Sequence, residues 1–507
     1  SGVINLDSMA VDGTFTLSPH STGAVTVVND AGLDLAASTM GGTFSGTATT
    51  GNISDAGALA ITGAATFITG ATGSNIILDV ASNAFSNSVE MRADDGSEAF
   101  GNITFVDSAA VDFDSSASAN GDLFINASTD GAVGGNLNVT ATTGNITQNA
   151  ALTVTGTTTL TTSANDATIT LNNTSNAFTG AMTITTNDAS GTDADVTIDG
   201  GTTALNIGAS TIDGDLTVTS GNASGIIDSG NVTVGGNLVA TTDANSGVID
   251  LGTTTVTGTM DLTSHGSGDV TIDNANADIV LIASEIGGNL TLTTGNASGI
   301  IDSGNVTVGG NLVATTDANS GVIDLDSMAV DGTFTLSPHG TGAVTIVNDA
   351  GLDLAASTMG GTFSGTATTG NITDTGALAI TGTTTLVTSA NDAFIDLDHG
   401  GHAFTGALLI TTNDTGTDTA GDVTISAGSG AALDFGNSTI DGDLIATSSN
   451  ATGITDSGAL TVRGTSSFRT TATNADISLG TSTLGDGTGT DTITLNTTGS
   501  GGDATLD

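Results

Sequence analysis

Internal repetition constrains the fold of this chain more than any other feature of its sequence. Three segments each occur twice: 1–63 and 320–382 with five differences, 221–251 and 295–325 without change, and 156–188 and 382–414 with a shared pattern. Such near-identity indicates recent duplication of modules. Repeat proteins bury their apolar surface by stacking each repeat on its neighbours. We therefore interpret residues 1–507 as one continuous repeat array.

A shorter period lies inside the duplicated modules. Residues 225–246, 247–268 and 321–342 align at a length of 22, and their apolar side chains then fall into columns. The columns contain Ile227, Ile249 and Ile323; Val234, Val256 and Val330; Leu238, Met260 and Phe334; and Ala240, Leu262 and Leu336. Along the chain, apolar residues alternate with Thr at a spacing of two, which is the period of a β-strand. Gly, Asn, Asp and Ser separate these strands, as turn residues do.

This pattern predicts an all-β fold, a right-handed parallel β-solenoid (β-helix) with about 22 residues and three short strands per coil. Successive coils would place like residues above one another at about 4.8 Å, with the apolar columns facing inward. No segment shows a sustained helical stripe, so we expect almost no helix. Residues 269–298, 187–201 and 413–425 do not fit the period, and we expect long coils or loops that bulge from one corner.

Two other folds are compatible with parts of this pattern. Low complexity with high net charge is typical of disordered chains. However, the apolar residues repeat in register and the mean hydropathy is +0.21, so there is apolar surface to bury. An array of β-sandwich domains would also be all-β, but 22 residues are too few for such a domain. The periodicity therefore favours the solenoid.

The charge of the chain argues against two classes of partner. There are 3 Lys+Arg against 53 Asp+Glu, the net charge is −50, and the three cations are Arg92, Arg463 and Arg469. Nucleic acids and anionic membrane surfaces are bound through Lys and Arg, so we expect neither as a partner. No apolar run approaches the roughly 20 residues of a membrane-spanning helix. No signal peptide is visible, and we interpret the chain as a mature product or a segment of a longer one.

The residue types that catalysis would need are scarce. A β-solenoid lyase needs Lys or Arg beside the substrate carboxylate, and a glycosidase needs two carboxylates at a fixed separation. The chain has no Cys, Trp or Tyr, and its Glu residues are Glu90, Glu98 and Glu285. Aromatic platforms that hold a sugar are therefore missing. We predict no enzymatic activity, no catalytic residue and no cofactor other than a calcium ion.

The five histidines fall into two groups. His20, His265 and His339 occupy equivalent turn positions in their coils. The segment 396–402 has the spacing of a metal site and contains Asp396, Asp398, His399 and His402. Two imidazoles and two carboxylates are a ligand set for zinc in principle. A polar loop is the simpler interpretation of this segment, and we favour it.

Acidic loops are better candidates for calcium, which prefers oxygen ligands. Residues 486–493 resemble one unit of the RTX nonapeptide G-G-x-G-x-D-x-U-x, and residues 188–199 and 414–422 are rich in Asp. The candidate ligands are Asp188, Asp193, Asp195, Asp414, Asp418, Asp422, Asp486 and Asp491. The alternative interpretation is a solvated acidic corner that keeps the chain in solution.

Stacking has two further consequences for the polar residues. Equivalent Asp side chains of successive coils are predicted to lie about 5 Å apart and to repel one another unless salt, protons or cations intervene. Acceptor tripeptides for N-glycosylation are frequent and begin at Asn52, Asn102, Asn138, Asn222, Asn305 and Asn371, among others. These residues could carry outward glycans at coil corners, or they could form inward ladders joined side chain to side chain.

The pattern GNLTLTTGNASGIIDSGNVTVGGNLVATT resembles the repeats of filamentous-haemagglutinin-type adhesins and of giant bacterial surface proteins. The resemblance covers most of the chain. It implies a right-handed β-helical fibre that is exported to the cell surface.

We expect a structural role for this chain. It would be a segment of an extracellular fibre at the cell surface, as an adhesin stalk, a surface filament or a sheath. Exposed strand edges invite strand addition, so we also expect self-association end to end or continuation in a longer chain. The alternative is a repetitive binding module whose acidic or Thr-rich faces engage calcium, glycans or ice.

Overall fold

The structure, a computed structural model, contains strands and turns but no helix among the residues that it describes. Those residues are 2–93, 101–114, 122–125, 132–189, 193–243, 246–415, 420–487 and 491–506. The chain divides into two compact units, Ser1–Gly258 and Thr259–Asp507. The predicted all-β parallel solenoid with about 22 residues per coil is confirmed. In the described residues we find no helix of the length and apolarity that a membrane crossing requires.

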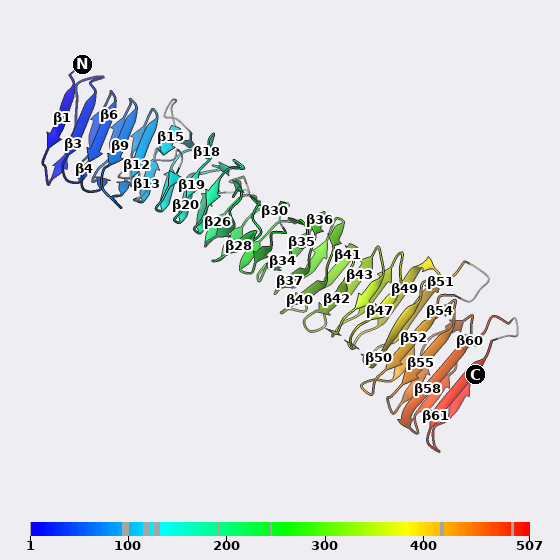
Figure 1. Ribbon diagram of the computed structural model, residues 1–507. Coiled ribbons are helices and arrows are strands. Elements are labelled where there is room, and N and C mark those ends of the chain that lie inside the picture. Colours follow the sequence, from blue (N-terminus) through cyan, green and yellow to red (C-terminus); the bar gives the residue numbers. More distant parts are fainter. Residues whose placement is uncertain are drawn as a thin grey trace. The chain divides into compact units, whose positions relative to one another are not determined.

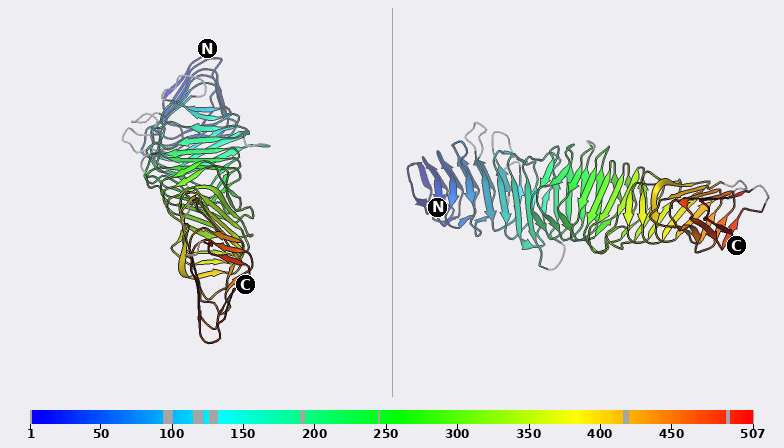
Figure 2. Two further views of the ribbon diagram at one scale, coloured as in Figure 1. Left: turned by 90° about the vertical axis from the view of Figure 1, so that its right-hand side faces the viewer. Right: turned by 90° about the horizontal axis from the view of Figure 1, so that it is seen from below.

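Each coil is built from one long strand and two short strands. One coil of the first unit contains β3 (Val25–Asn29), β4 (Leu33–Leu35) and β5 (Ser38–Met40). The next coil contains β6 (Phe44–Ala48), β7 (Ile53–Asp55) and β8 (Leu59–Ile61). Each of these three strands pairs in parallel with its counterpart in the coil before it. Figures 1 and 2 show such rows of parallel arrows within each unit.

The interior of the coils is apolar and closely filled. Side chains along the long strands alternate between buried and partly exposed, as the period of two predicts. In the first unit, Phe44, Phe67, Phe85 and Phe105 stack on one another, with successive ring centroids 5.2, 6.1 and 5.2 Å apart. Such stacked rings bury a large apolar area and add specific aromatic contacts. The interior is therefore formed by like residues of successive coils.

One predicted column is displaced by a single residue. Ile226, not Ile227, is buried, and it lies opposite Ile249 in the parallel register. Ile227 lies opposite Asp250 and is half-buried on the outer side. Neighbouring residues of a strand point to opposite faces, so a shift of one position reverses the side chain. The alignment failed here because the GII segment offers two isoleucines in succession.

The coils are grouped into larger modules that the 22-residue period alone does not reveal. A module consists of three coils, each in the order long, short, short, followed by a closing long strand. In the first module the remaining strands are β9 (Ala65–Thr69), β10 (Ile76–Leu78), β11 (Ala84–Phe85) and β12 (Val89–Ala93). In some coils the two short strands are fused, as in β41 (Ile323–Val330) and β50 (Ile395–Phe404).

The same order of strands recurs along both units. In the first unit the further long strands are β13 (Ile103–Asp107), β17 (Leu137–Ala141), β20 (Thr158–Asn165), β23 (Met182–Asn187), β24 (Val196–Asp199), β27 (Leu216–Ser220) and β30 (Leu238–Thr242). In the second unit they are β33 (Met260–Ser264), β34 (Val270–Asp273), β37 (Leu290–Thr294), β40 (Leu312–Thr316), β42 (Thr333–Ser337), β43 (Val344–Asn348), β46 (Phe363–Ala367), β49 (Thr384–Asn391), β51 (Leu408–Asn413), β52 (Val423–Ala427), β55 (Leu444–Ser448), β58 (Ser466–Thr473) and β61 (Ile493–Thr498).

Between modules, one long strand is followed directly by another, and we call this junction a switch. At the switch between β12 and β13, β12 pairs with the long strand β9, whereas β13 pairs with the short strand β10. The long strands thereby pass to the side of the coil that held the short strands. The same exchange occurs between β23 and β24 in the first unit, and at β33–β34, β42–β43 and β51–β52 in the second. A module therefore winds through three and a half coils.

The switches explain the segments that do not fit the 22-residue period. We expected bulging loops at 187–201 and 413–425, but β24 and the start of β52 lie there with buried side chains. Residues 269–298 were expected to form one long coil, but they begin with the long strand β34, which follows a switch. The expectation of corner loops is therefore wrong for these strands. The residues that exceed the 22-residue period therefore belong to the switch loop and to the long strand that begins the next module.

The predicted stacking of Asp on Asp holds at some corners but not along the strands. In the strand registers described within each unit, Asp112 opposite Asp122 is the only such pair. Elsewhere Asp lies beside a hydroxyl residue, as Asp434 does opposite Thr455, or beside an apolar one, as Asp250 does opposite Ile227. At the corners before long strands, Asp195 and Asp215 occupy neighbouring coils, and the Asp215 N–H donates to Asp195 Oδ1 at 2.8 Å. Hydroxyl and apolar residues separate like charges along the strands. At the corners, burial raises the pKa of Asp302 and the negative charge of Asp326 in the next coil adds to this, so repulsion between successive coils is present there.

A buried serine completes the first coil after a switch. In that coil, two short strands and the bend between them stack on the long strand that precedes the switch. One central N–H group of this long strand faces the bend and has no backbone acceptor there. In the second unit, Leu336 N–H of β42 donates to Ser357 Oγ at 3.0 Å, and the Ser357 hydroxyl donates to the Ala355 carbonyl at 2.9 Å. The equivalent serines in the described residues are Ser38, Ser210, Ser284 and Ser438.

Replacing Ser357 by Ala should destabilise its coil by about 1–3 kcal/mol, because the buried Leu336 N–H would lose its acceptor. Amide exchange of the segment around Leu336, with urea unfolding, measures the effect. Ser364→Ala in β46 is the matched control, since Ser364 faces outward and its loss should change stability by less than about 0.5 kcal/mol. Equal effects of the two substitutions would contradict the role of the buried serine.

The displaced column gives a second test. Ile226→Ala removes a fully buried side chain and should cost about 2–5 kcal/mol. Ile227→Ala removes a half-buried outward side chain and should cost less than about 1 kcal/mol. Both variants are compared by chemical denaturation. A larger effect at Ile227 than at Ile226 would show that the register is wrong.

Candidate functional site

The predicted calcium-binding acids lie mainly in two switch loops, between β23 and β24 and between β51 and β52. Asp188 and Asp414 occupy the same place in these loops. The Asp188 N–H donates to Asp213 Oδ2 at 2.9 Å, and the Asp414 N–H donates to Asp441 Oδ2 at 3.0 Å. These contacts join the loop to the next coil, which is a structural role.

Asp195 and Asp422 occupy the corners before long strands. Their Oδ1 atoms accept the N–H groups of Asp215 and Asp443 at 2.8 and 2.9 Å. Asp193 is exposed, and Asp418 lies outside the described residues. In the segment that resembles an RTX unit, the Asp486 N–H donates to Asp491 Oδ2 at 3.0 Å. Binding of calcium by these residues stays a prediction.

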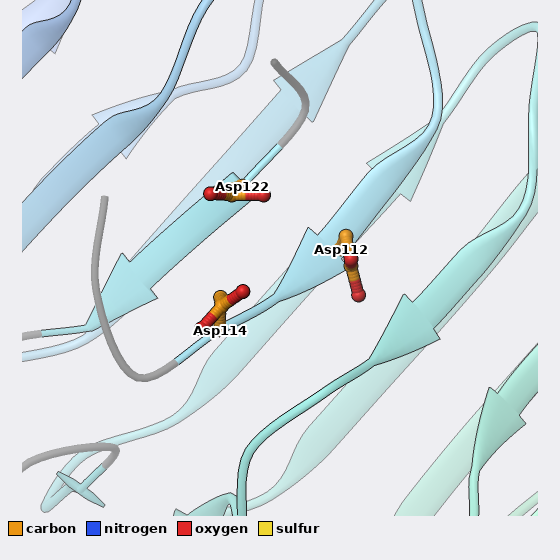
Figure 3. Close-up of side chains that lie close together, drawn as sticks. All are labelled: Asp112, Asp114 and Asp122. Atoms are coloured by element: carbon orange, nitrogen blue, oxygen red, sulfur yellow. The ribbon is translucent and has the colours of Figure 1, made fainter. Parts of the chain in front are cut away.

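A different set of acids comes together in the first unit. The ligand atoms of Asp112, Asp114 and Asp122 all lie within 4.8 Å of one another. Within the described parts of the chain, they are the only group of three His, Cys, Asp or Glu residues with this geometry. Figure 3 shows Asp112 on β14 (Val111–Phe113), Asp114 just past the end of that strand and Asp122 at the start of β15 (Asp122–Ile125). We call this set the acidic triad.

The acidic triad depends on an unusual order of strands. β15 follows β14 in the chain, but it pairs on one side with β12 and on the other with β14. The strand is thus inserted between two coils that would otherwise be neighbours. This insertion places Asp122 directly opposite Asp112. The coil that contains it is long, since Ile103 pairs with Leu137, 34 residues later.

The charges of the acidic triad are partly shielded from water. Asp122 is only 4% exposed. Asp112 Oδ1 accepts the Thr147 hydroxyl at 3.0 Å, and its Oδ2 accepts Asn149 Nδ2 at 2.5 Å. Burial raises the pKa of Asp112, and the negative charges of Asp122 and Asp114 raise it further against the Thr147 hydrogen bond. Such a site favours a proton or a cation, because either one reduces the repulsion.

Sequence analysis missed the acidic triad. Its signal in the sequence is an Asp-x-Asp pair followed eight residues later by another Asp, and a chain with 53 Asp+Glu contains similar combinations by chance. The inserted strand that brings the residues together follows from the three-dimensional pairing. No local spacing indicates it.

Among the described residues, Asp396, Asp398, His399 and His402 do not bring three ligand atoms within 4.8 Å of one another, as a zinc site would require. The His402 side chain is fully buried, its Nδ1 accepts the Leu378 N–H at 3.0 Å, and its Nε2 lies 3.4 Å from Asp374 Oδ2. Burial is the main cause that lowers the pKa of His402 to about 4. The alternative interpretation, a polar loop, is also wrong for His402, because this residue lies in the core strand β50. Its partner in the core is Asp374.

The other three histidines confirm the predicted equivalence. His265 and His339 lie in the switch loops before β34 and β43, and His20 lies in the equivalent loop between β2 (Thr14–Phe15) and β3. The carbonyls of His20, His265 and His339 each accept the N–H of a glycine three residues later, at 3.4, 3.1 and 3.1 Å. A backbone contact of this kind closes a turn. His265 and His339 mark the switches.

Asparagines at the corners form a ladder of a kind that neither earlier alternative described. The Oδ1 atoms of Asn52, Asn75 and Asn102 accept the N–H groups of Asn75, Asn102 and Asn136 at 2.9, 2.7 and 2.8 Å. The ladder is at the surface and joins side chain to backbone. The ladder uses Oδ1, and Asn52 and Asn102 are exposed, which glycosylation requires.

Two surface hollows recur at equivalent corners, one in each unit. They measure about 300 and 280 Å³. Asp12, Asp34 and Asn52 line the first, and Asp331, Asp353 and Asn371 line the second. Their acidic and amide walls would suit a small cation or a polar group.

Comparison with known proteins places the modules in a family. The family described as "Repeats of unknown function (DUF5649)" matches residues 22–92, 101–185, 193–251, 267–337, 341–411 and 420–483. Four of the six matches, 22–92, 101–185, 267–337 and 341–411, begin and end at the ends of a module, so the family repeat corresponds to the module of three and a half coils. The matches 193–251 and 420–483 begin at a switch and end inside a module. No match was found among curated proteins or among solved structures.

Proposed function

The chain belongs to the DUF5649 repeat family, and from this premise we propose that it is a structural segment of an extracellular β-solenoid fibre, as an adhesin stalk, surface filament or sheath. The observation that carries the proposal is the closure of each module. Every module begins and ends with a long strand, so any module can follow any other across a switch. An array of this kind changes its length without a new core.

The location at the cell surface is part of the proposal. It is supported by the resemblance of the repeats to those of surface adhesins. The acidic and hydroxyl-rich surface, with 53 Asp+Glu and 3 Lys+Arg, keeps a β-rich fibre in solution. End-to-end self-association and attached glycans are further predictions from the repeat pattern. In this role the chain holds other parts at a distance, and it performs no chemistry.

The proposal is tested by labelling intact cells that produce the protein. Gold-labelled antibodies against the folded chain should bind before the cells are permeabilised. Electron microscopy should show these gold particles at a distance outside the cell envelope. A variant that lacks residues 267–340, one module with its following switch loop, should remain folded and be shorter by about 17 Å at about 4.8 Å per coil. Labelling only after permeabilisation would refute the extracellular role, and unfolding of the shortened variant would refute the modular one.

Cation binding is a second candidate function, and the acidic triad is the observation that favours it. Carboxylate oxygens suit calcium. A bound cation would hold β15 against β14, because it bridges Asp122 and the Asp112–Asp114 pair.

Calcium should raise the melting temperature more than sodium chloride at equal ionic strength, since a bound ion neutralises the acidic triad directly, whereas screening acts only at a distance. Thermal unfolding followed by circular dichroism measures both. Asp114→Asn should remove the excess effect of calcium. Asp250→Asn is the control, because Asp250 is exposed on β31 (Ile249–Leu251) and should leave the effect intact. If calcium adds nothing beyond sodium, this candidate function fails.

A further inference from the structure

Two equivalent corners of the duplicated modules are built with different side chains. Asn83 and His402 occupy the same position in segments that begin with 1–63 and 320–382. Asn83 Oδ1 accepts the Leu59 N–H at 2.9 Å, and its Nδ2 donates to Asp55 Oδ2 at 2.6 Å. His402 accepts the Leu378 N–H in the same way, and its Nε2 faces Asp374 without forming a hydrogen bond to it.

The two side chains match at the acceptor atom. His402 Nδ1 replaces Asn83 Oδ1 as the acceptor, at 3.0 Å from the Leu378 nitrogen. Since Nδ1 accepts, the neutral ring carries its hydrogen on Nε2, which lies 3.4 Å from Asp374 Oδ2. The side chains of His402 and Asp374 are 0% and 2% exposed. The corner therefore holds the neutral imidazole through one hydrogen bond, whereas it holds the amide through two.

Acid distinguishes the two corners. An amide gains no proton in the range where proteins stay folded, but an imidazole does. A second proton on His402 must bind to Nδ1. Nδ1 would then be a hydrogen-bond donor and could no longer accept the Leu378 N–H. Leu378 begins β48 (Leu378–Ile380), which pairs with β50. Loss of the acceptor would leave a buried N–H unsatisfied at the point where β47 (Ile372–Asp374) bends into β48.

The groups around His402 are few. Asp374 faces it from β47, and Asp398 and His399 flank it on β50, with Asp396 close to Asp374 and Asp398. β48 and β52, which pack against β50, contain no titratable residue. Burial lowers the pKa of His402, the charge of His399 lowers it further, and Asp398 opposes both. Burial also raises the pKa of Asp374 and that of its counterpart Asp55.

We propose that the corner formed by β47, β48 and β50 is a proton-sensitive joint, in which protonation of His402 removes the acceptor of the Leu378 amide and opens the bend. The corresponding corner at Asn83 is the insensitive version of the same joint. Acidification thus loosens one coil of the second unit and leaves its duplicate in the first unit closed.

The direction of the effect follows from the two pKa values of His402. In the open corner His402 has the usual imidazole pKa of 6.5, and in the closed corner its pKa is lowered to about 4. The open state is therefore favoured as the pH falls from about 6.5 to about 4, by up to tenfold per pH unit. Between pH 7 and pH 5 the opening constant should rise about twentyfold. The carboxyls Asp374 and Asp55 act in the opposite sense, and both corners contain one.

The experiment compares amide exchange of two nearly identical segments, 54–63 and 373–382, within the same full-length protein at pH 7, 6 and 5. Rates are corrected for the intrinsic effect of pH. We expect opening of 373–382 to rise about twentyfold and opening of 54–63 to stay nearly constant. His402→Asn should abolish the rise, and Asn83→His should transfer it to 54–63. Nitrogen-15 chemical shifts of His402 should show a proton on Nε2 alone at pH 7.

The outcomes decide the proposal. Equal pH responses of the two segments would overturn it, as would an unchanged response in His402→Asn. If a substitution prevents folding, the wild-type comparison and the His402 tautomer still decide: a hydrogen on Nδ1 at pH 7 would also overturn the proposal.

Discussion

Every coil of this protein depends on the coils on either side of it. Ile323 shows how this works: it is paired in parallel with Ile300 in the coil before it and with Val344 in the coil after it, and it is 0% exposed. Parallel strands satisfy their backbone groups only in the adjacent coil, so each coil completes the core and the hydrogen bonds of its neighbours.

The second demand on the fold comes from the bends between short strands. A bend interrupts the ladder of backbone hydrogen bonds, and the protein replaces the missing partner by a buried polar side chain. Ser357, Asn83 and His402 are three solutions to this one problem. A buried N–H without a partner is costly, so these polar residues inside the coil are structural elements. They also explain why a histidine is found in the core of so acidic a chain.

Sequence reasoning predicted the solenoid because columns such as Val234 and Val256 recur at a strand period, and both are buried. It misassigned Ile227 because two adjacent isoleucines fit the column equally well. It also missed the switches, since Thr-rich long strands look alike on either side of a coil and their side is set by pairing. The acidic triad escaped it for a related reason: Asp122 meets Asp112 only through a strand inserted out of chain order.

The half coil in each module has a geometric consequence within each unit. A whole number of coils would keep every long strand on one side, but three and a half coils exchange the sides at every switch. An odd number of inserted modules therefore moves the later long strands of that unit to the opposite side of the coil, and an even number restores them. Unequal recombination between near-identical modules can thus change which side of a unit displays its long strands, with no residue on that side changed.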